Sequence, residues 1–412
     1  MKTVRYILAA PNIDGTDVGE AFVAFKWAEA LSSLVDLTVL SFERSERKPL
    51  QDQLPDARVV SWREPEWLRR HERFNAMAKP GYPIWSFRVR NWLRTALANG
   101  EKFDLVHQIM PQAMRYASPF RHFDIPYIIG PLGGALSTPE KFQSEVGTAP
   151  FFTQFRRLDR FRLHHDPWLR ASYGKAAAVL GVAPYVRDML RDIPIQRFEA
   201  VLELGIDAPA NPKPKTYVDG ALKLLHVGRG VRTKGLRDLV RAMARLEDMR
   251  EVTLTSAGSG EEVEICRAEA KRLNVSDRVS FLGRVPRAEV EHLYRNHDVF
   301  VFPSFREPAG GVLYEAMRWG MPIITVDRGG PGWIVDDSCG IRLPVVSPQL
   351  LSRDLEIAIR KLATSPELRI KLGQGSLKKV TKEGLWQKKA QRIVDLSRQI
   401  IANPSQNFQK VA

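Results

Sequence analysis

The strongest constraint on the fold is an alternation of short apolar runs with helical patterns, which starts twice along the 412 residues. In the first half, apolar runs cover 4–10, 35–42, 104–110, 126–130 and 176–183, and a helical pattern covers 20–34. In the second half, apolar runs at 222–228, 252–257, 278–283, 299–302 and 322–326 alternate with helical patterns at 234–246, 261–273, 287–296 and 312–319. Runs this apolar are typical of parallel strands buried on both faces. The alternation predicts an α/β protein with two doubly wound sheets.

The boundary between the two halves is expected at residues 211–220, NPKPKTYVDG, which are polar and contain two prolines. We therefore expect Rossmann-like domains over 1–210 and 211–385, facing a central cleft. Ligands of such sheets bind at the carboxyl ends of the strands, where the strand order reverses. Loops that follow strands are therefore the places to search for a site.

Composition excludes several classes of protein. Hydrophobic residues make up 44% and charged residues 26% of the chain, as in ordinary globular proteins. The two cysteines, Cys266 and Cys339, form no CxxC motif, so neither a disulfide framework nor a structural zinc site is expected. No apolar run reaches the roughly 18 residues of a membrane-spanning helix, and the first apolar run is too short for a secretory signal. These features predict a cytoplasmic protein.

The net charge of +15 predicts polyanions or anionic surfaces as partners. Residues 211–412 contain 34 basic and 23 acidic residues, so the excess is greatest in the second half.

The most informative stretch is 303–320, PSFREPAGGVLYEAMRWG, which follows an apolar strand and opens a helix. Gly310 and Gly311 let the backbone approach a ligand, and free amides at a helix start attract phosphate. Glu307 would lie on the loop and Glu315 one turn into the helix, where a carboxylate can reach the hydroxyls of a ribose. The pattern indicates a nucleotide. The alternative is that both glutamates are ordinary surface charges, the second favoured by the helix dipole.

A second stretch, 227–236, VGRGVRTKGL, also lies at the end of a predicted strand. Arg229 and Lys234 flank a short glycine-containing loop, where two cations could hold a pyrophosphate. Solvated basic loop residues are the alternative reading.

Together, GR-x4-KG and E-P-A-G-G-x3-E-A resemble the motifs of the retaining GT-B glycosyltransferases of the group-one class, family four. The resemblance extends to AGSG at 257–260, FLGRVP at 281–286, DVFVFPS at 298–304 and GGP at 329–331. It covers nearly the whole chain and is looser in the first domain. The fold that it implies is GT-B.

The resemblance also implies roles for particular residues of the second domain. Arg229 and Lys234 would neutralise the donor pyrophosphate, Glu307 would contact donor-sugar hydroxyls, and Glu315 would bind the ribose. The backbones expected to contact sugar and phosphate are those of Gly310, Gly311 and Val312, and the expected wall of the base pocket is Gly283, Arg284 and Val285.

In the first domain, the resemblance points to His107 as a contact of the donor sugar, with a purely structural role as the alternative. Gly15 and Gly19 would form a phosphate or acceptor loop, although the usual Gly-Gly pair is absent there. Gly133 and Gly134, in GPLGG, would shape the acceptor side. The C-terminal helix, about 386–412, would return to this domain.

The implied activity is transfer of a sugar, with retention, from a nucleotide-diphosphate sugar to a glycan or lipid-linked acceptor in polysaccharide, lipopolysaccharide or glycolipid synthesis. No DxD sequence occurs, which agrees with a reaction that needs no metal and no cofactor, since protein cations can replace a divalent ion.

Basic and aromatic residues mix over 62–94 and 151–170, which could dock the protein on an anionic membrane, at the inner face of the cytoplasmic membrane. Aromatic core residues beneath basic helix faces are the alternative. Other functions stay open. One alternative keeps the fold and changes the chemistry: a sugar-nucleotide epimerase, or a phosphorylase, for which no pyridoxal-phosphate lysine is recognisable. The other is a basic nucleic-acid-binding protein, for which no motif is present.

Overall fold

The computed structural model describes residues 3–44, 46–69, 79–147, 156–210 and 220–403. Most of the expected linker, 211–219, and the end of the C-terminal segment, 404–412, lie outside these residues. The chain forms two compact units. The first is Met1–Ala135, Phe152–Glu203 and Trp386–Ala412, and the second is Leu136–Phe151 and Leu204–Leu385.

These units differ in two ways from the expected ranges of 1–210 and 211–385. The main boundary falls between Glu203 and Leu204, several residues before the expected linker. Residues 136–151 belong to the second unit although they lie within the first half of the sequence. The physical reason for the second difference is Phe142, which is fully buried in the hydrophobic core of the second unit.

The first unit is built on a parallel sheet of seven strands in the order β3-β2-β1-β4-β5-β6-β7. The buried patterns of its central strands explain this position, because β4, β5 and β6 have no exposed residue. The strands are β1 (Arg5–Asn12), β2 (Asp36–Glu43), β3 (Arg58–Arg63), β4 (Leu105–Gln108), β5 (Tyr127–Leu132), β6 (Ala178–Gly181) and β7 (Phe198–Ala200). The helices are α1 (Glu20–Ser32), α2 (Leu50–Gln53), α4 (Tyr82–Ala98), α5 (Arg156–His165), α6 (Pro167–Gly174), α7 (Tyr185–Met189) and α15 (Trp386–Ala402).

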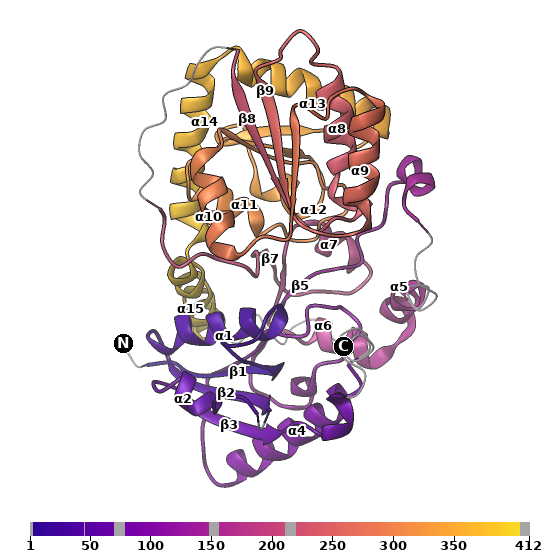
Figure 1. The fold of residues 1–412 in the computed structure, drawn as a ribbon. Coiled ribbons are helices and arrows are strands. Elements are labelled where there is room, and N and C mark those ends of the chain that lie inside the picture. Colours follow the sequence, from indigo (N-terminus) through magenta and orange to yellow (C-terminus); the bar gives the residue numbers. More distant parts are fainter. Residues whose placement is uncertain (1–2, 45, 70–78, 148–155, 211–219, 404–412) are drawn as a thin grey trace. The chain divides into compact units, whose positions relative to one another are not determined.

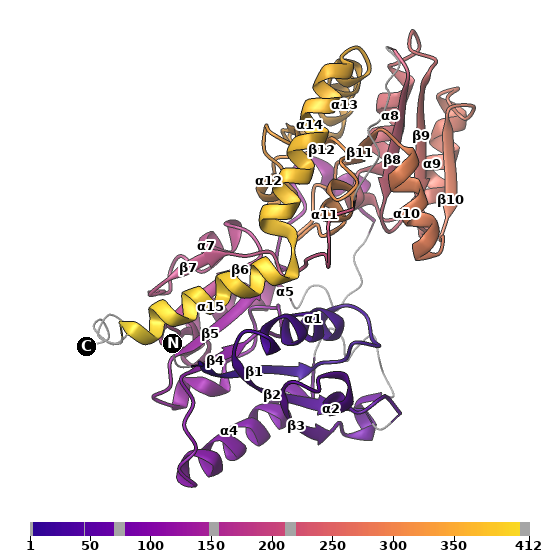
Figure 2. The ribbon, with the colours of Figure 1, turned by 90° about the vertical axis from the view of Figure 1, so that its left-hand side faces the viewer.

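Helix α15 completes the core of the first unit although it ends the described chain (Figure 2). The Trp386 ring meets the Trp27 ring of α1 edge to face, with centroids 5.9 Å apart. Two hydrogen bonds fix the same corner: Trp27 Nε1 donates to the carbonyl of Glu203 at 2.8 Å, and Lys389 Nζ donates to the carbonyl of Leu202 at 3.0 Å. The first half of the sequence therefore lacks a part of its own core until α15 is added.

The second unit is a parallel sheet of six strands in the order β10-β9-β8-β11-β12-β13. Figure 1 shows α8 and α9 on one side of this sheet and α10 and α14 on the other. The strands are β8 (Leu222–Val227), β9 (Val252–Ala257), β10 (Val279–Gly283), β11 (Val299–Phe302), β12 (Ile323–Val326) and β13 (Gly340–Leu343). The helices are α8 (Leu236–Ala244), α9 (Glu261–Arg272), α10 (Arg287–Asn296), α11 (Val312–Met317), α12 (Gly329–Ile334), α13 (Pro348–Ala363) and α14 (Pro366–Lys379).

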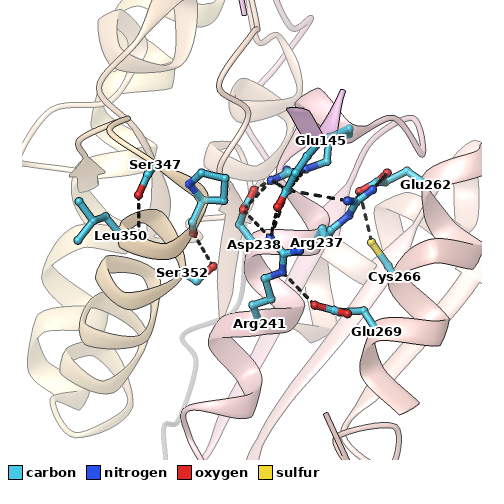
Figure 3. A network of polar contacts seen from close by, with 12 residues as sticks. Glu145, Arg237, Asp238, Arg241, Glu262, Cys266, Glu269, Ser347, Leu350 and Ser352 are labelled. Carbon is cyan, nitrogen blue, oxygen red and sulfur yellow. Dashed lines mark hydrogen bonds and ion pairs between the residues drawn. The ribbon is translucent and has the colours of Figure 1, made fainter. Parts of the chain in front are cut away.

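Local sequence sets where these helices begin. Helix α13 starts after Ser347, whose hydroxyl accepts a hydrogen bond from the Leu350 amide at 3.3 Å (Figure 3). Pro348 occupies the first helical position, where its missing N–H costs nothing.

The predicted α/β class with two doubly wound sheets is confirmed. Among the described residues, no helix is both long enough and apolar enough to span a bilayer.

Replacing Trp386 by alanine should destabilise the first unit. The side chain is 5% exposed, so truncation leaves a cavity against Trp27 and should lower the free energy of unfolding by about 3–5 kcal/mol. Urea unfolding followed by circular dichroism measures the change. The control is Trp168→Ala, since Trp168 is 69% exposed and its loss should cost less than about 1 kcal/mol. Equal losses for the two variants would contradict this role of α15.

Candidate functional site

The carboxyl edge of the second sheet brings together the basic motif at 227–236 and the motif at 303–320, which contains Glu307 and Glu315. Strands β8 and β11 are neighbours, and the chain leaves them in opposite directions, to β9 and to β12. This reversal is the switch point at which open α/β sheets bind ligands. Arg229 and Lys234 follow β8, and Glu307 follows β11. The sequence motifs therefore meet where a ligand site is expected.

Lys234 and Glu307 form an ion pair, and each side chain is 14% exposed. The Lys234 ammonium also lies 5.1 Å from the ring centroid of Phe302, the last residue of β11. Arg229 differs, because its side chain is exposed and makes no hydrogen bond or ion pair with any residue that the structure describes. One cation is fixed in place, and the other is available to an anionic ligand.

Glycine allows the loops of this edge to approach through their main chains. Gly235 has φ of 79°, and a Cβ there would lie 2.2 Å from the carbonyl oxygen of Pro303. Beside it, Ser304 Oγ donates to the Thr233 carbonyl at 3.0 Å. The loop that carries Lys234 and the loop that carries Glu307 are thus held together by main-chain packing that any larger residue would prevent.

The loops after β8, β9 and β10 are joined in the same way. A Cβ on Gly258, which has φ of 142°, would lie 1.7 Å from the Gly228 carbonyl oxygen. The Gly258 amide donates to the Gly283 carbonyl at 2.7 Å. Of the expected base-pocket wall, Gly283 ends β10, Arg284 is exposed and Val285 is half-buried. These residues are therefore tied to the loop of Arg229 through Gly258.

Glu315 lies one turn into α11, as the sequence predicts, and its carboxylate accepts a hydrogen bond from Tyr294 Oη at 3.2 Å. Its side chain reaches solvent. Partial removal of water by the surrounding protein raises the pKa of the carboxyl, and the hydrogen bond from Tyr294 acts in the opposite direction. Gly310, with φ of 95°, and Gly311 directly precede Val312, the first residue of the helix. Backbone amides at this position lack intrahelical acceptors, so they can bind an anion.

A buried histidine beneath this edge has no counterpart in the sequence analysis. His226 lies in β8 and is 1% exposed. Its ring stacks on Phe302, and its Nδ1 forms a hydrogen bond with Ser256 Oγ at 3.2 Å. Burial lowers its pKa to about 4, and the Lys234 backbone partly offsets this effect. In the sequence, His226 stands among the apolar residues of a strand, as a histidine with a purely structural role would. No sequence signal therefore marks it as part of a site.

The candidate glycines of the first unit follow two strands of the first sheet. Gly15 and Gly19 come after β1, and the Gly15 amide donates to Gln53 Oε1 at 2.8 Å. Gly133 and Gly134 come after β5, where the Gly134 carbonyl accepts from Tyr185 Oη at 3.0 Å. Their contacts with phosphate or acceptor stay predictions.

His107 occupies the interior of the first sheet, on β4, with no exposed surface. Its Nε2 lies 2.6 Å from the Gly130 carbonyl, which can only accept, so Nε2 carries the proton. Nδ1 then accepts from Tyr6 Oη at 2.9 Å. Both nitrogens are thus engaged within the core, which leaves none for a sugar hydroxyl. This arrangement corresponds to the structural role, the alternative that the sequence left open.

Burial lowers the pKa of His107 to about 4, with the bond to Gly130 offsetting part of the effect. The unfolded chain protonates near pH 6.5 and the folded chain does not, so stability should fall as pH drops from about 6.5 towards 4. From pH 8 to pH 5, His107 should account for about 2 kcal/mol of the loss.

Urea unfolding of wild type and His107→Asn at the two pH values isolates this contribution, because the variant lacks the titrating group. The control is His292→Asn, whose imidazole is 63% exposed and should leave the pH dependence unchanged. A wild-type pH dependence in His107→Asn would contradict the buried neutral state.

Two family models match the chain in order. The model "Glycosyl transferase 4-like domain" matches residues 19–202, and "Glycosyl transferases group 1" matches residues 207–379. Among curated relatives, the glycogen synthase of Mycobacterium tuberculosis is 30% identical over 193 residues, 45% of each chain. The lipopolysaccharide core biosynthesis glycosyltransferase LpsE of Rhizobium meliloti is 30% identical over 179 residues, 43% of this chain and 47% of the relative. The chain thus aligns with less than half the length of these relatives.

Solved structures share the fold over nearly all of the chain. Sucrose-phosphate synthase from Thermosynechococcus elongatus has a TM-score of 0.64 at 19% identity and covers 96% of this chain and 99% of its own. HepE of Anabaena, solved with UDP, has a TM-score of 0.63 at 16% identity, with 96% and 100% covered. These likenesses and the two parallel sheets confirm the GT-B fold. Because both family models are of glycosyltransferases and together match most of the sequence, the chain belongs to the group 1 glycosyltransferases.

Proposed function

We propose that this protein transfers a sugar, with retention of anomeric configuration, from a nucleotide-diphosphate sugar to a glycan or lipid-linked acceptor. The observation that carries the proposal is the meeting of Arg229, Lys234 and Glu307 at the switch point of the second sheet. Two cations and one carboxylate at this edge fit a donor whose pyrophosphate is negative and whose sugar presents hydroxyls.

Donor binding uses both cations of the edge. Arg229 is exposed and unpaired among the described residues, so it can pair with a phosphate without breaking an existing contact. Lys234 is held by Glu307 until a phosphate arrives, and Glu307 then turns to the sugar hydroxyls. Gly310, Gly311 and Val312 supply backbone amides, and Glu315 binds the ribose diol while Tyr294 fixes its carboxylate. Gly283, Arg284 and Val285 line the base.

In the transfer step, an acceptor hydroxyl bonds to the anomeric carbon as the bond from that carbon to the diphosphate oxygen breaks. The hydroxyl attacks from the face that the diphosphate leaves, so configuration is retained, and its proton passes to the departing phosphate oxygen. Negative charge builds on the leaving diphosphate, where Arg229 and Lys234 stabilise it. In this scheme, protein cations do the work of a divalent ion, and no cofactor takes part.

Relatives and structural neighbours support this donor class. HepE of Anabaena was solved with UDP and glucose, and the pneumococcal O-GlcNAc transferase GtfA with UDP and GlcNAc. Curated relatives include a glycogen synthase and lipopolysaccharide core glycosyltransferases. We therefore place the acceptor among growing polysaccharides, lipopolysaccharides or glycolipids. An epimerase of the same fold is the second candidate, distinguished by a changed sugar nucleotide formed without an acceptor.

The membrane part of the proposal concerns the first unit, on the cytoplasmic side of the membrane. Trp67, Phe87, Phe161 and Trp168 are each more than half exposed, and the Arg121 guanidinium lies 6.0 Å from the Trp168 ring. Exposed aromatic rings beside cations suit an anionic lipid surface. Other aromatics of 62–94 serve the core instead, since Tyr82 and Trp85 are buried. Phe74 and Phe151 lie outside the described residues.

Thermal-shift titration with UDP, GDP and ADP separately tests the donor site. A diphosphate at about 100 times its dissociation constant should add roughly 2.7 kcal/mol and raise the melting temperature by a few degrees. Glu315→Ala should weaken that binding about 10- to 100-fold, because a charged hydrogen-bond acceptor is lost. Glu289→Ala, which removes an exposed glutamate of α10, is the matched control. A shift by a short DNA duplex and by none of the diphosphates would favour the nucleic-acid function.

Lys234→Ala should lower the turnover of donor by about 10²- to 10³-fold with the fold intact, because stabilisation of the leaving diphosphate is lost. Arg229→Ala should act in the same direction. Release of nucleoside diphosphate from UDP-glucose, GDP-mannose and ADP-glucose, with water as the acceptor of the sugar, measures the rate, and the same assay with EDTA should give an unchanged wild-type rate. The control is Lys371→Ala, an exposed lysine of α14. Near-normal turnover in Lys234→Ala would overturn the assignment.

A further inference from the structure

Residues 136–147, here called the arm, follow β5 of the first sheet in sequence but belong to the second unit. Phe142 anchors the arm, since it is fully buried in the second core and its ring centroid lies 4.4 Å from that of Phe305. Val146 packs on the same core. The arm is therefore an integral part of the unit that carries the donor site.

Glu145 of the arm enters a network of polar contacts that includes Asp238, Arg237 and Arg241 (Figure 3). It pairs with Arg232 at 2.6 Å and with Arg241 at 2.9 Å. Arg232 is 5% exposed and also forms two hydrogen bonds, at 2.6 and 2.8 Å, with the fully buried Asp238. Partial burial acts to raise the pKa of Glu145, but the arginines, Arg232 first, outweigh it and hold that pKa below its ordinary value. Glu145 is thus ionised and neutralises part of a buried arginine cluster.

The arm contacts residues that stand two positions before each of the proposed catalytic side chains in sequence. The Arg232 guanidinium lies 5.7 Å from the Phe142 ring centroid and 5.1 Å from that of Phe305. Arg232 opens the 3-10 turn η5 (Arg232–Lys234), which ends at Lys234. Phe305 stands two residues before Glu307 in the loop after β11. One packed cluster therefore fixes the backbone under Lys234 and under Glu307.

The start of the arm contacts the flanks of the same loops. Arg306 Nη1 donates to Thr138 Oγ1 at 3.0 Å, beside Glu307. Arg328 Nη2 donates to the Ser137 carbonyl at 2.9 Å, from the loop that follows β12. These contacts extend the arm along the edge where the donor is proposed to bind.

We propose that the arm is a positioning element for sugar transfer, in which Glu145 and Phe142 hold Arg232 and Phe305 and thereby hold Lys234 and Glu307. This inference rests on the proposed function of those two side chains. A displacement of about 1 Å in a charge that stabilises a leaving group costs up to about 100-fold in rate. Glu145 is a positioning residue, because its effect on Lys234 passes through Arg232.

The test compares Glu145→Gln with Glu140→Gln. Both change one arm glutamate to its neutral isostere, but Glu140 is exposed, and its carboxylate makes no hydrogen bond or ion pair with any residue that the structure describes. Diphosphate release from UDP-glucose, GDP-mannose and ADP-glucose, with water as the acceptor of the sugar, is measured well below the melting temperature of every variant. Glu145→Gln should lower kcat by about 10- to 100-fold, more than it raises KM, because the lost alignment matters most as charge develops. Glu140→Gln should behave as wild type.

A double-mutant cycle separates positioning from simple destabilisation. If Glu145 acts through Lys234, adding Glu145→Gln to Lys234→Ala should lower kcat less than about twofold further. Full additivity of the two losses would overturn the inference. Near-normal turnover in Lys234→Ala alone would instead overturn the proposed function, so the two failures are distinguishable.

Hydrogen exchange provides a readout that needs no substrate. Glu145→Gln and Phe142→Leu should both speed amide exchange in 232–236 and 305–309, while Glu140→Gln should leave it unchanged. Exchange in these two segments that is the same in Glu145→Gln as in wild type would overturn the positioning role. Restoration of slow exchange and of kcat by Glu145→Asp would support it.

Discussion

Contacts between main chains at the carboxyl edge of the second sheet set the geometry on which the site depends. Where Gly258 meets Gly228 and Gly235 meets Pro303, no side chain separates the loops. Side chains from different loops then lie close enough to act on one ligand. The ion pair of Lys234 with Glu307 is a result of this approach, because the two residues come from strands that are neighbours in space and far apart in sequence.

Beneath that edge, the second unit contains the buried guanidinium of Arg232, which requires an oppositely charged partner. Arg232 is buried, and an unpaired guanidinium at this depth would cost several kcal/mol. Asp238 supplies one partner from α8, and Glu145 supplies another from the arm, 87 residues before Arg232 in sequence. The two phenylalanine rings around Arg232 exclude water and leave the guanidinium few alternative positions. Such a cluster adds little to the free energy of unfolding, but removing one partner leaves a buried charge uncompensated, so Arg232, Asp238 and Glu145 depend on one another.

Periodicity predicted most strands of both sheets well. In the second unit β9, β11 and helix α10 have the expected bounds, and in the first unit the ends of β1, β2, β4, β5 and β6 lie within two residues of the expected ones. Edge strands such as β3 and β13 were missed, because half-exposed strands carry a weaker apolar signal. The motifs placed Arg229, Lys234 and Glu307 after strand ends and Glu315 one turn into a helix, as in the structure, since spacing relative to a strand end is a local property. The position of the arm could not be predicted from the sequence, because no pattern within residues 136–147 indicates which of the two cores Phe142 packs in. For the same reason, the sequence could not decide between the two roles of His107, which depend on Tyr6 and Gly130 as neighbours.

The interleaving of the two units also constrains the order in which the chain can be assembled. A ribosome releases the arm before any strand of the second sheet, and it releases α15 after the strands of both sheets, although α15 closes the first core. Neither core is therefore complete when the middle of the chain emerges. Trp27 cannot form its ring contact before Trp386 has been synthesised, and Phe142 cannot form its contact before Phe305 has been synthesised. During synthesis, apolar surface of the first unit stays open until α15 has emerged, which is later than in a chain whose two domains follow one another end to end.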